Sequence, residues 1–141
     1  MSMFPELRMR RLRSLKLIKE TRLSKDELIL PLFIDENIAR GKKPIESMPG
    51  QYRFSIEESV NEVAVARSLG IKSVLLFGIP AKKDEIGSES YNRNGVIQRA
   101  VRRIRAEVGD DVVIITDLCL CEYTTHGHCG LVENGKVKND P

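Results

Sequence analysis

Three nearly unbroken runs of apolar residues divide the chain. They cover residues 28–34, 71–77 and 112–116. Runs of this length without polar alternation are typical of β-strands that are buried on both faces. Pro31 lies inside the first run and counts against a central strand there, because proline has no N–H group to donate to a neighbouring strand. The pattern still predicts three strands with little exposure to solvent.

Apolar residues recur at helical spacing between these runs. The first series follows Ser55, which has Glu58 three residues later as in a capping box, and Gly70 stands where a helix should end. Gly109 ends the second series in the same way. The spacing predicts helices over residues 56–69 and 96–108. The apolar positions are Ile56, Val60, Val63, Ala64 and Leu69 in the first helix, and Val96, Ile97, Ala100, Val101, Ile104 and Val108 in the second. A basic face opposite the second apolar series is made of Arg99, Arg102, Arg103 and Arg105.

The order strand, helix, strand, helix, strand predicts an α/β fold with a parallel sheet that is covered by helices. Turn-forming residues between positions 41 and 50 predict a loop, and so does the polar stretch from 87 to 94. The chain has neither a G-x-G-x-x-G motif after its first strand nor a Walker A motif. The usual fingerprints of nucleotide-binding α/β proteins are therefore missing.

The composition narrows the class of protein. The chain has 141 residues, of which 41% are hydrophobic and 30% are charged, as in one globular domain or a part of one. No apolar run approaches the roughly 18 residues that a membrane span requires. Three cysteines are an odd number and too few for a disulfide scaffold, which favours a reducing compartment. These features exclude secreted disulfide-rich, membrane-spanning and fibrous proteins, and they predict a cytoplasmic location.

Positive charge is concentrated at the N-terminus. Residues 1–25 hold eight Lys and Arg against two Glu, a net charge of +6, which leaves −3 for the rest of a chain whose total is +3. Arg10-Arg11 resembles a twin-arginine signal, but no apolar segment or small-residue cleavage site follows it, so a targeting segment is rejected. A basic segment on a mildly acidic body predicts an arm. A small zinc module that binds nucleic acid through residues 8–25 is an alternative, but the segment lacks interleaved aromatic residues, so no nucleic-acid partner is expected.

All three cysteines and both histidines of the chain lie between positions 119 and 129. Thiolate and imidazole together suit zinc best. Cys119 and Cys121 point to the same side of an extended segment, and turns at Gly127 and Gly130 can bring Cys129 back as a third ligand. Three protein ligands leave a position open for water or substrate, as in catalytic zinc sites. Three alternatives remain: a structural site with four ligands that includes His126 or His128, cysteines buried as small apolar residues, and a redox pair, for which C-x-C is the wrong spacing.

The segment Asp117-x-Cys119-x-Cys121-Glu122-Tyr123-Thr124-x-His126-Gly127-His128-Cys129-Gly130 resembles the zinc signature of the 5-aminolevulinate dehydratase family, also called the porphobilinogen synthases. The resemblance extends along the chain in the order of the family. It includes Arg10-Arg11-Leu12-Arg13 as the N-terminal arm, Leu30-Pro31-Leu32-Phe33 as the first barrel strand, Met48-Pro49-Gly50, Phe77-Gly78-Ile79, and Asp84-Glu85-x-Gly87-Ser88. Pro31 is then a feature of the family.

The resemblance implies a TIM-type (β/α)₈ barrel with an N-terminal arm. It also implies an enzyme of tetrapyrrole and haem biosynthesis, a hydro-lyase that condenses two molecules of 5-aminolevulinate to porphobilinogen with loss of water. Two lysines form Schiff bases with the two substrates. Zinc, held by Cys119, Cys121 and Cys129, binds and polarises the substrate whose amino group stays free, and Asp117 is an active-site carboxylate near the Schiff-base amines. The family further implies a homo-oligomer, typically an octamer in which each arm wraps a neighbour, and Mg²⁺ bound by residues outside this chain.

A complete barrel of this type needs about 250 residues. Residues 1–27 are expected to form the basic arm and residues 28–141 the first part of the barrel, with about three of its strands. The lysines present follow no buried strand at its carboxyl end, so the two Schiff-base lysines are expected beyond Pro141, on a C-terminal remainder that is a necessary partner. The 141 residues are then the N-terminal part of the enzyme, cut or split after Pro141 and inactive alone. A non-catalytic assembly subunit that keeps only the arm and the zinc site is the second alternative.

Overall fold

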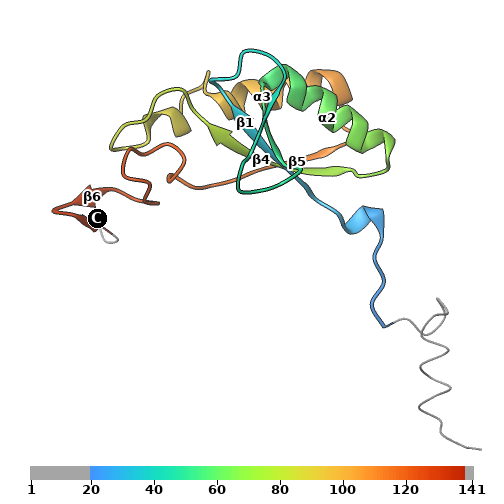
Figure 1. Ribbon diagram of the computed structural model, residues 1–141, viewed down its shortest axis with the longest axis horizontal. Helices are drawn as coiled ribbons and strands as arrows, with labels where there is room; N and C mark the ends of the chain where they lie inside the picture. The colour runs from blue at the N-terminus through green and yellow to red at the C-terminus, as the bar shows by residue number, and fades with distance from the viewer. Residues whose placement is uncertain (1–19, 139–141) are drawn as a thin grey trace, which may run out of the picture.

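Five strands form one sheet in the order β2-β3-β1-β4-β5 in the computed structural model, which describes residues 20–138 (Figure 1). The strands are β1 (Leu30–Asp35), β2 (Lys42–Pro44), β3 (Tyr52–Phe54), β4 (Ser73–Ile79) and β5 (Val113–Thr116). The helices are α2 (Ile56–Ser68) and α3 (Val96–Val108), with short 3₁₀ turns η2 (Lys25–Glu27) and η3 (Ser88–Ser90). A separate hairpin of β6 (Val132–Glu133) and β7 (Lys136–Val137) follows. The predicted βαβαβ order is confirmed by β1, α2, β4, α3 and β5.

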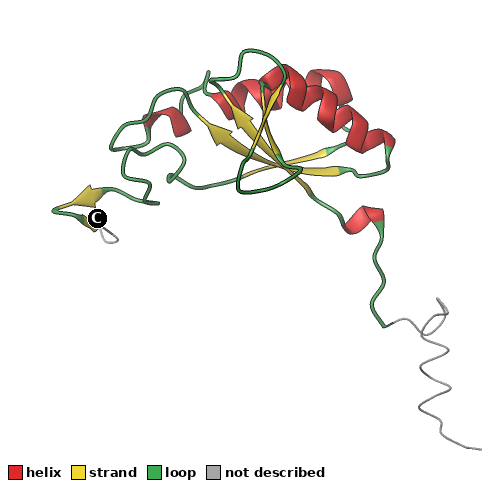
Figure 2. Ribbon diagram, viewed as in Figure 1, coloured by secondary structure: helices red, strands yellow, loops and turns green. Residues whose placement is uncertain are grey.

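Both helices cover the same face of the sheet (Figure 2). Strands β1, β4 and β5 are parallel neighbours, and each connection between them runs through one helix. β4 lies beside β1, and β5 lies beside β4 in the same direction across the sheet. Crossover connections between parallel strands are almost always right-handed. The two helices therefore fall on one face, as they do in a barrel, whereas a doubly wound sheet reverses direction and covers both faces. The fold class is α/β with the one-sided layering of a barrel segment.

The core lies between the helices and the covered face of the sheet. Alternate residues of the two central strands point into it, because successive side chains of a strand face opposite ways. Ile34, Val74 and Leu76 of the sheet are completely inaccessible, and so is Ile104 of α3. The apolar positions expected on α3 are buried, apart from the half-buried Val101. The helical spacing thus identified the face of α3 that packs on the sheet.

The opposite face of the sheet has no covering layer among residues 20–138. Its central side chains are apolar: the rings of Phe33 and Phe77 stack with centroids 5.3 Å apart, and Leu75 and Ile115 are adjacent in register. Arg53, in register with Phe33, makes the β3 end of this face polar and lies 3.8 Å from the Asp35 carboxylate. Val113, on the edge strand β5, is 58% exposed. The expectation that the three runs are buried on both faces is therefore wrong for the described residues, because helices cover only one face of this sheet. A row of apolar side chains on an open face is what the interior of an incomplete barrel requires.

The predicted helix boundaries agree with the structure, with one difference. Ser55 is the N-cap of α2, and its hydroxyl accepts a hydrogen bond from the Glu58 amide at 3.2 Å. Leu69 was expected on the apolar face but is 59% exposed, because the helix ends at Ser68 and the following turn directs Leu69 outward. Gly109 follows α3 with a positive φ of 60°, as a helix stop should.

The loop expected around positions 41–50 contains a hairpin that the sequence pattern did not indicate. Strand β2 pairs antiparallel with β3, and β3 pairs parallel with the carboxyl end of β1. The ammonium group of Lys42 lies 4.5 Å from the centre of the Tyr52 ring, which gives this charged strand a favourable cation–π contact. The sequence Lys-Lys-Pro has no strand pattern, so tertiary pairing decides the conformation of β2.

Pro31 lies within β1 and is exposed. At that position β1 is paired in register with β4 only, because the partners in β3 begin at Phe33. A missing N–H is tolerated in such a half-paired stretch of strand.

Residues 1–19 of the expected arm lie outside the described residues, as do positions 139–141. The described part of the arm contains η2, where Ser24 and Glu27 form a capping box. No helix within residues 20–138 is long and apolar enough to cross a membrane.

Candidate metal centre

The cysteine segment begins where β5 ends, at the carboxyl edge of the parallel strands. The amide of Asp117 donates to the Leu76 carbonyl of β4 at 3.2 Å, so the sheet ladder continues for one residue beyond β5. The chain then leaves the sheet. In α/β barrels, loops at the carboxyl ends of the strands carry the functional groups. The cysteines therefore follow directly after the carboxyl end of the edge strand β5.

A tight turn brings two of the three thiols together. The amides of Tyr123 and Thr124 both donate to the Leu120 carbonyl, at 2.9 and 3.0 Å. The sulfur atoms of Cys119 and Cys121 are 2.9 Å apart on the inside of this turn. The two thiols share one side, as expected, but the segment is not extended through Cys121, because the turn starts at Leu120.

The third thiol arrives after a reversal of the chain. Gly127 adopts a left-handed φ of 70°, which turns the chain back, and Cys129 brings its sulfur to 3.0 Å from that of Cys119. Gly130, expected to help the turn, has no positive φ; a Cβ there would lie 2.9 Å from Val137 Cγ1, so this glycine allows close packing with β7. The structure thus brings together all three cysteines that the sequence predicted as ligands.

The donor set and its spacing fit a zinc ion. The three sulfur atoms lie within 4.8 Å of one another, and none is in a disulfide. Sulfur atoms that surround a tetrahedral zinc ion at about 2.3 Å are about 3.8 Å apart, so the cluster needs to open by less than about 1 Å. Cys129 is exposed and the other two cysteines are half-buried, which leaves the cluster accessible from solvent.

The three thiols differ in acidity. The pKa of Cys129 is lowered by its contacts with the thiol of Cys119, the larger cause, and with that of Cys121. The pKa of Cys121 is raised, chiefly by its hydrogen bond with Cys119 and also by burial and by the Glu122 carboxylate. Metal binding deprotonates such ligands and releases protons.

Two carboxylates lie beside the sulfur atoms. Oxygen atoms of Asp117 and Glu122 and the sulfur of Cys119 lie within 4.8 Å of one another. Asp117 is exposed, and Glu122 accepts a hydrogen bond from the Cys121 thiol at 3.3 Å. Asp117 was expected in the site from the family resemblance. Nothing in the sequence reasoning assigned a contact to Glu122, although its position next to Cys121 was a signal.

The two histidines do not join the sulfur cluster. Among residues 20–138, the groups of three or more potential metal ligands contain neither His126 nor His128. Nδ1 of His126 accepts a hydrogen bond from the His128 amide at 3.1 Å, and Nε2 lies 3.1 Å from the Glu85 carbonyl. The two imidazoles stack with centroids 5.6 Å apart. His126 serves as a connection between loops in this arrangement.

Tyr123 fixes the turn against the sheet. Its hydroxyl lies 2.6 Å from the place that a Cβ would take on Gly78 of β4, so the absence of a side chain there makes room for it. Burial raises the pKa of Tyr123 to about 12, and the negative charges of Glu122 and Asp117 add to the shift. Phe77-Gly78-Ile79 entered the sequence analysis only as a family motif, and the structure gives its glycine a packing role.

The surroundings of the lysines bear on where a Schiff-base amine can lie. Every lysine within residues 20–138 is exposed. Among the strands of the five-stranded sheet, Lys82 and Lys83 come closest to a carboxyl end, in the loop after β4. A lysine that acts as a nucleophile near neutral pH requires an apolar or cationic environment to lower its pKa, and an exposed loop does not provide one.

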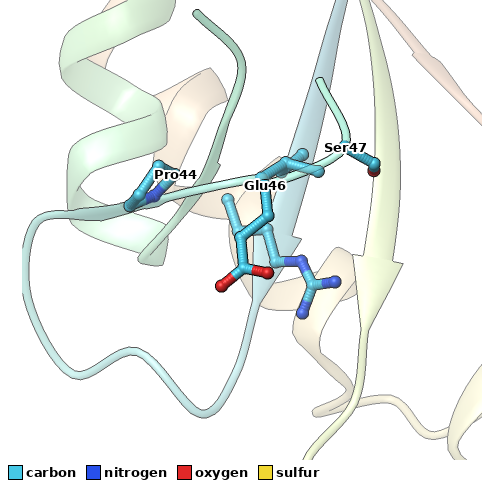
Figure 3. Close-up of a pocket in the computed structure, with 5 residues that line it drawn as sticks. Pro44, Glu46 and Ser47 are labelled. Atoms are coloured by element: carbon cyan, nitrogen blue, oxygen red, sulfur yellow. The ribbon is translucent and has the colours of Figure 1, made fainter. Parts of the chain in front are cut away.

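A pocket lies at the β2–β3 hairpin, at the opposite edge of the sheet from β5 and the cysteine segment (Figure 3). Pro44, Glu46 and Ser47 form part of its wall, together with Ile45 and Arg53. Arg53 is also 3.8 Å from the Asp35 carboxylate at the end of β1. The lining contains no cysteine or histidine and does not overlap the sulfur cluster.

Comparisons with known proteins converge on one family. A family model described as "Delta-aminolevulinic acid dehydratase" matches residues 6–141. Two proteins with that same name, from Archaeoglobus fulgidus and Methanothermus sociabilis, are 55% identical to this chain over 143 residues and 50% identical over 141. They match 99% and 97% of this chain, which covers 44% and 43% of their lengths.

A solved structure shows the same relation. The crystal structure of delta-aminolevulinic acid dehydratase (porphobilinogen synthase) from Toxoplasma gondii, in complex with the reaction product porphobilinogen, superposes with a TM-score of 0.85 at 36% sequence identity. The match covers 99% of this chain and 40% of that one. The chain therefore spans less than half the length of these relatives.

Proposed function

Because the chain belongs to the delta-aminolevulinic acid dehydratase family, we propose that it forms the zinc-binding N-terminal part of a porphobilinogen synthase. The complete enzyme condenses two molecules of 5-aminolevulinate to porphobilinogen with loss of water. The observation that carries the proposal is the meeting of three cysteine sulfurs, within 4.8 Å, at the carboxyl edge of a sheet. Three thiols at this spacing are a donor set that suits zinc.

Cys119, Cys121 and Cys129 are the zinc ligands in this proposal. They supply three sulfur donors and leave the fourth position open, as in a catalytic site. When bound, zinc supplies a Lewis acid that polarises a substrate carbonyl. The chain's own part is to hold three thiolates in one place and to leave the cluster open toward solvent through the exposed Cys129.

Asp117 has the role of a supporting carboxylate. It lies at the end of β5 and groups with Cys119 and Glu122. An anionic side chain at this edge stabilises positive charge on a substrate ammonium or a protonated Schiff base. Two lysines that form the Schiff bases are assigned to the C-terminal remainder of the enzyme, because the described lysines of this chain are all exposed.

The remainder of the enzyme closes the barrel over the open face of the sheet. Phe33, Phe77, Leu75 and Ile115 form the part of the barrel interior that this chain provides. Residues 1–27 form the arm and residues 28–141 the first part of the barrel. A homo-octamer joined through the arms, and Mg²⁺ bound by residues outside this chain, complete the proposal.

A fused enzyme tests this function. Residues 1–141 are joined to the C-terminal part of the Archaeoglobus fulgidus protein that this chain does not match, a combination favoured by the 55% identity of the matched parts. The fusion is expected to form porphobilinogen from 5-aminolevulinate, whereas the 141-residue chain alone is expected to form none. A fusion that folds, binds zinc and makes no porphobilinogen contradicts the assignment.

Borohydride trapping locates the Schiff bases in the same fusion. With 5-aminolevulinate present, reduction is expected to attach substrate to lysines of the C-terminal part only. An adduct that peptide mapping finds on Lys82, Lys83 or another lysine of residues 1–141 would contradict the assignment of both Schiff-base lysines to the C-terminal part.

A further inference from the structure

The loop that follows β4 lies against the cysteine turn and is built around one carboxylate. We propose that Asp84 and Ser88 are positioning residues for the metal site, because they hold this support loop (residues 81–90) in the shape that clamps the cysteine turn. The inference rests on the proposed zinc site. It adds a function to two residues that contribute no ligand atom.

The Asp84 carboxylate organises the support loop from within. One oxygen accepts hydrogen bonds from the amides of Ile86 and Ser88, at 3.1 and 2.9 Å, and the other accepts one from the Ser88 hydroxyl. These bonds also lower the pKa of Asp84, with the Ser88 hydroxyl as the largest cause. Gly87, between the two donors, takes a left-handed φ of 66°. The loop therefore closes on an ionised side chain.

The backbone of Asp84 forms the clamp itself. Asp84 and Thr124 make an isolated parallel bridge: the Asp84 amide donates to the Tyr123 carbonyl at 3.4 Å, and the Thr125 amide donates to the Asp84 carbonyl at 3.0 Å. The His126 ring, 3.1 Å from the Glu85 carbonyl, adds a third connection. Tyr123, Thr125 and His126 of the cysteine segment are thus bonded to two residues of the support loop.

The clamped residues are those that determine where the sulfurs lie. Thr124 is almost completely buried, and its hydroxyl donates to the His128 carbonyl at 3.1 Å, one residue before Cys129. On the other side, the Thr124 amide closes the Leu120 turn that joins Cys119 and Cys121. Thr124, the residue that bridges to Asp84, is therefore bonded both to the turn that holds Cys119 and Cys121 and to the residue before Cys129.

The support loop is itself anchored at both ends. The amide of Ala81 donates to the Glu36 carboxylate at 2.8 Å, and Glu36 also pairs with Arg99 of α3. At the other end, the Gln98 side chain of α3 donates to the Ser90 carbonyl at 2.9 Å. Because α3 is packed in the core, these bonds hold the support loop, and with it the cysteine turn, in a fixed position relative to that helix. A ligand set that is held in place in advance loses less conformational entropy when a metal binds.

Zinc affinity of the 141-residue chain tests the inference. Zn²⁺ is titrated in competition with a chromogenic chelator for Asp84→Ala, Ser88→Ala and the matched control Asp110→Ala, whose fully exposed carboxylate lies beyond the far end of α3. Asp84→Ala is expected to bind zinc about tenfold more weakly than the control, as for the loss of a group that orients a ligand. Asp84→Asn, which keeps an acceptor oxygen for the two amides, is expected to restore most of the affinity.

Hydrogen exchange of the Thr125 amide gives a second readout that needs no metal. In the zinc-free chain this amide is expected to exchange at least tenfold faster in Asp84→Ala than in Asp110→Ala. Equal exchange and equal zinc affinity in the two variants would overturn the inference. If Asp84→Ala does not fold, Ser88→Ala decides, because it removes one side-chain donor from the loop and leaves the Asp84 carboxylate in place.

The two proposals fail in different ways. Absence of zinc binding in both the unmodified chain and Asp110→Ala contradicts the metal site, and Thr125 exchange then still reports whether Asp84 holds the turn. Zinc binding that is unaffected by Asp84→Ala leaves the metal site intact and removes the positioning role.

Discussion

Gly78→Ala is expected to destabilise the chain through one methyl group at the junction of β4, α3 and the cysteine turn. A Cβ on this residue would lie 2.5 Å from Ile97 Cγ1, 3.0 Å from Val96 Cγ1 and 2.6 Å from the Tyr123 hydroxyl. Ordinary van der Waals contact begins near 3.4 Å, so the contact with Ile97 is too short by about 0.9 Å. Both aliphatic neighbours are buried in the core and cannot simply rotate into solvent.

The expected cost follows from the size of this overlap. Extra methyl groups in a packed core cost about 1–3 kcal/mol. A value of about 2 kcal/mol changes the folding equilibrium roughly 30-fold. Urea unfolding followed by circular dichroism, at one fixed protein concentration, measures this change directly.

A double-mutant cycle with Ile97→Ala separates the clash from other effects. Removing the Ile97 side chain takes away Cγ1, the atom nearest to the new methyl group. The double variant is therefore expected to lose less stability than the sum of the two single variants, by about 0.5–3 kcal/mol. Strict additivity, or a loss below about 0.5 kcal/mol for Gly78→Ala alone, would refute the packing assigned to this glycine.

Two further predictions concern the site. Cys121→Ala is expected to lose zinc while His128→Ala keeps most of it, because only Cys121 belongs to the sulfur cluster; equal zinc content in the two purified variants would contradict this ligand set. The pKa of Asp84 is lowered from 3.8 on folding by the Ser88 hydrogen bonds, so its stabilising effect is complete above that pH and disappears as the pH falls through the lower folded value. The urea midpoints of the unmodified chain and Asp84→Ala are expected to differ at pH 7 and to converge in strong acid, and a pH-independent difference would contradict the role of the ionised carboxylate.

Local patterns predicted the main elements because those elements depend on local chemistry. The apolar spacing of α3 matches its buried face, and Ser55 and Gly109 mark helix ends through their own hydrogen bonds and φ angles. The same reasoning missed β2, since its residues pair only because β3 is beside them. It also missed the hairpin of β6 and β7, although Asn134 and Gly135, both with positive φ, are a typical two-residue hairpin turn.

The sequence predicted which cysteines lie together, but not which residues of other segments contact them. Cys119, Cys121 and Cys129 could be grouped because thiols at that density indicate a metal. The positions of Asp84 and Ser88 depend on a bridge between segments about 40 residues apart, which no periodicity reports. The exposed face of the sheet could not be predicted either, because an apolar run indicates burial but not which part of a protein covers each face.

The central claim is a zinc ion held by three sulfurs with one open position. Zinc K-edge X-ray absorption of the zinc-loaded chain is expected to show three sulfur neighbours at about 2.3 Å and one lighter, exchangeable ligand. Replacement of that lighter ligand by added 5-aminolevulinate in the fused enzyme would connect the site to the proposed reaction. A first shell of four sulfurs, or one that contains an imidazole nitrogen from His126 or His128, would contradict the account.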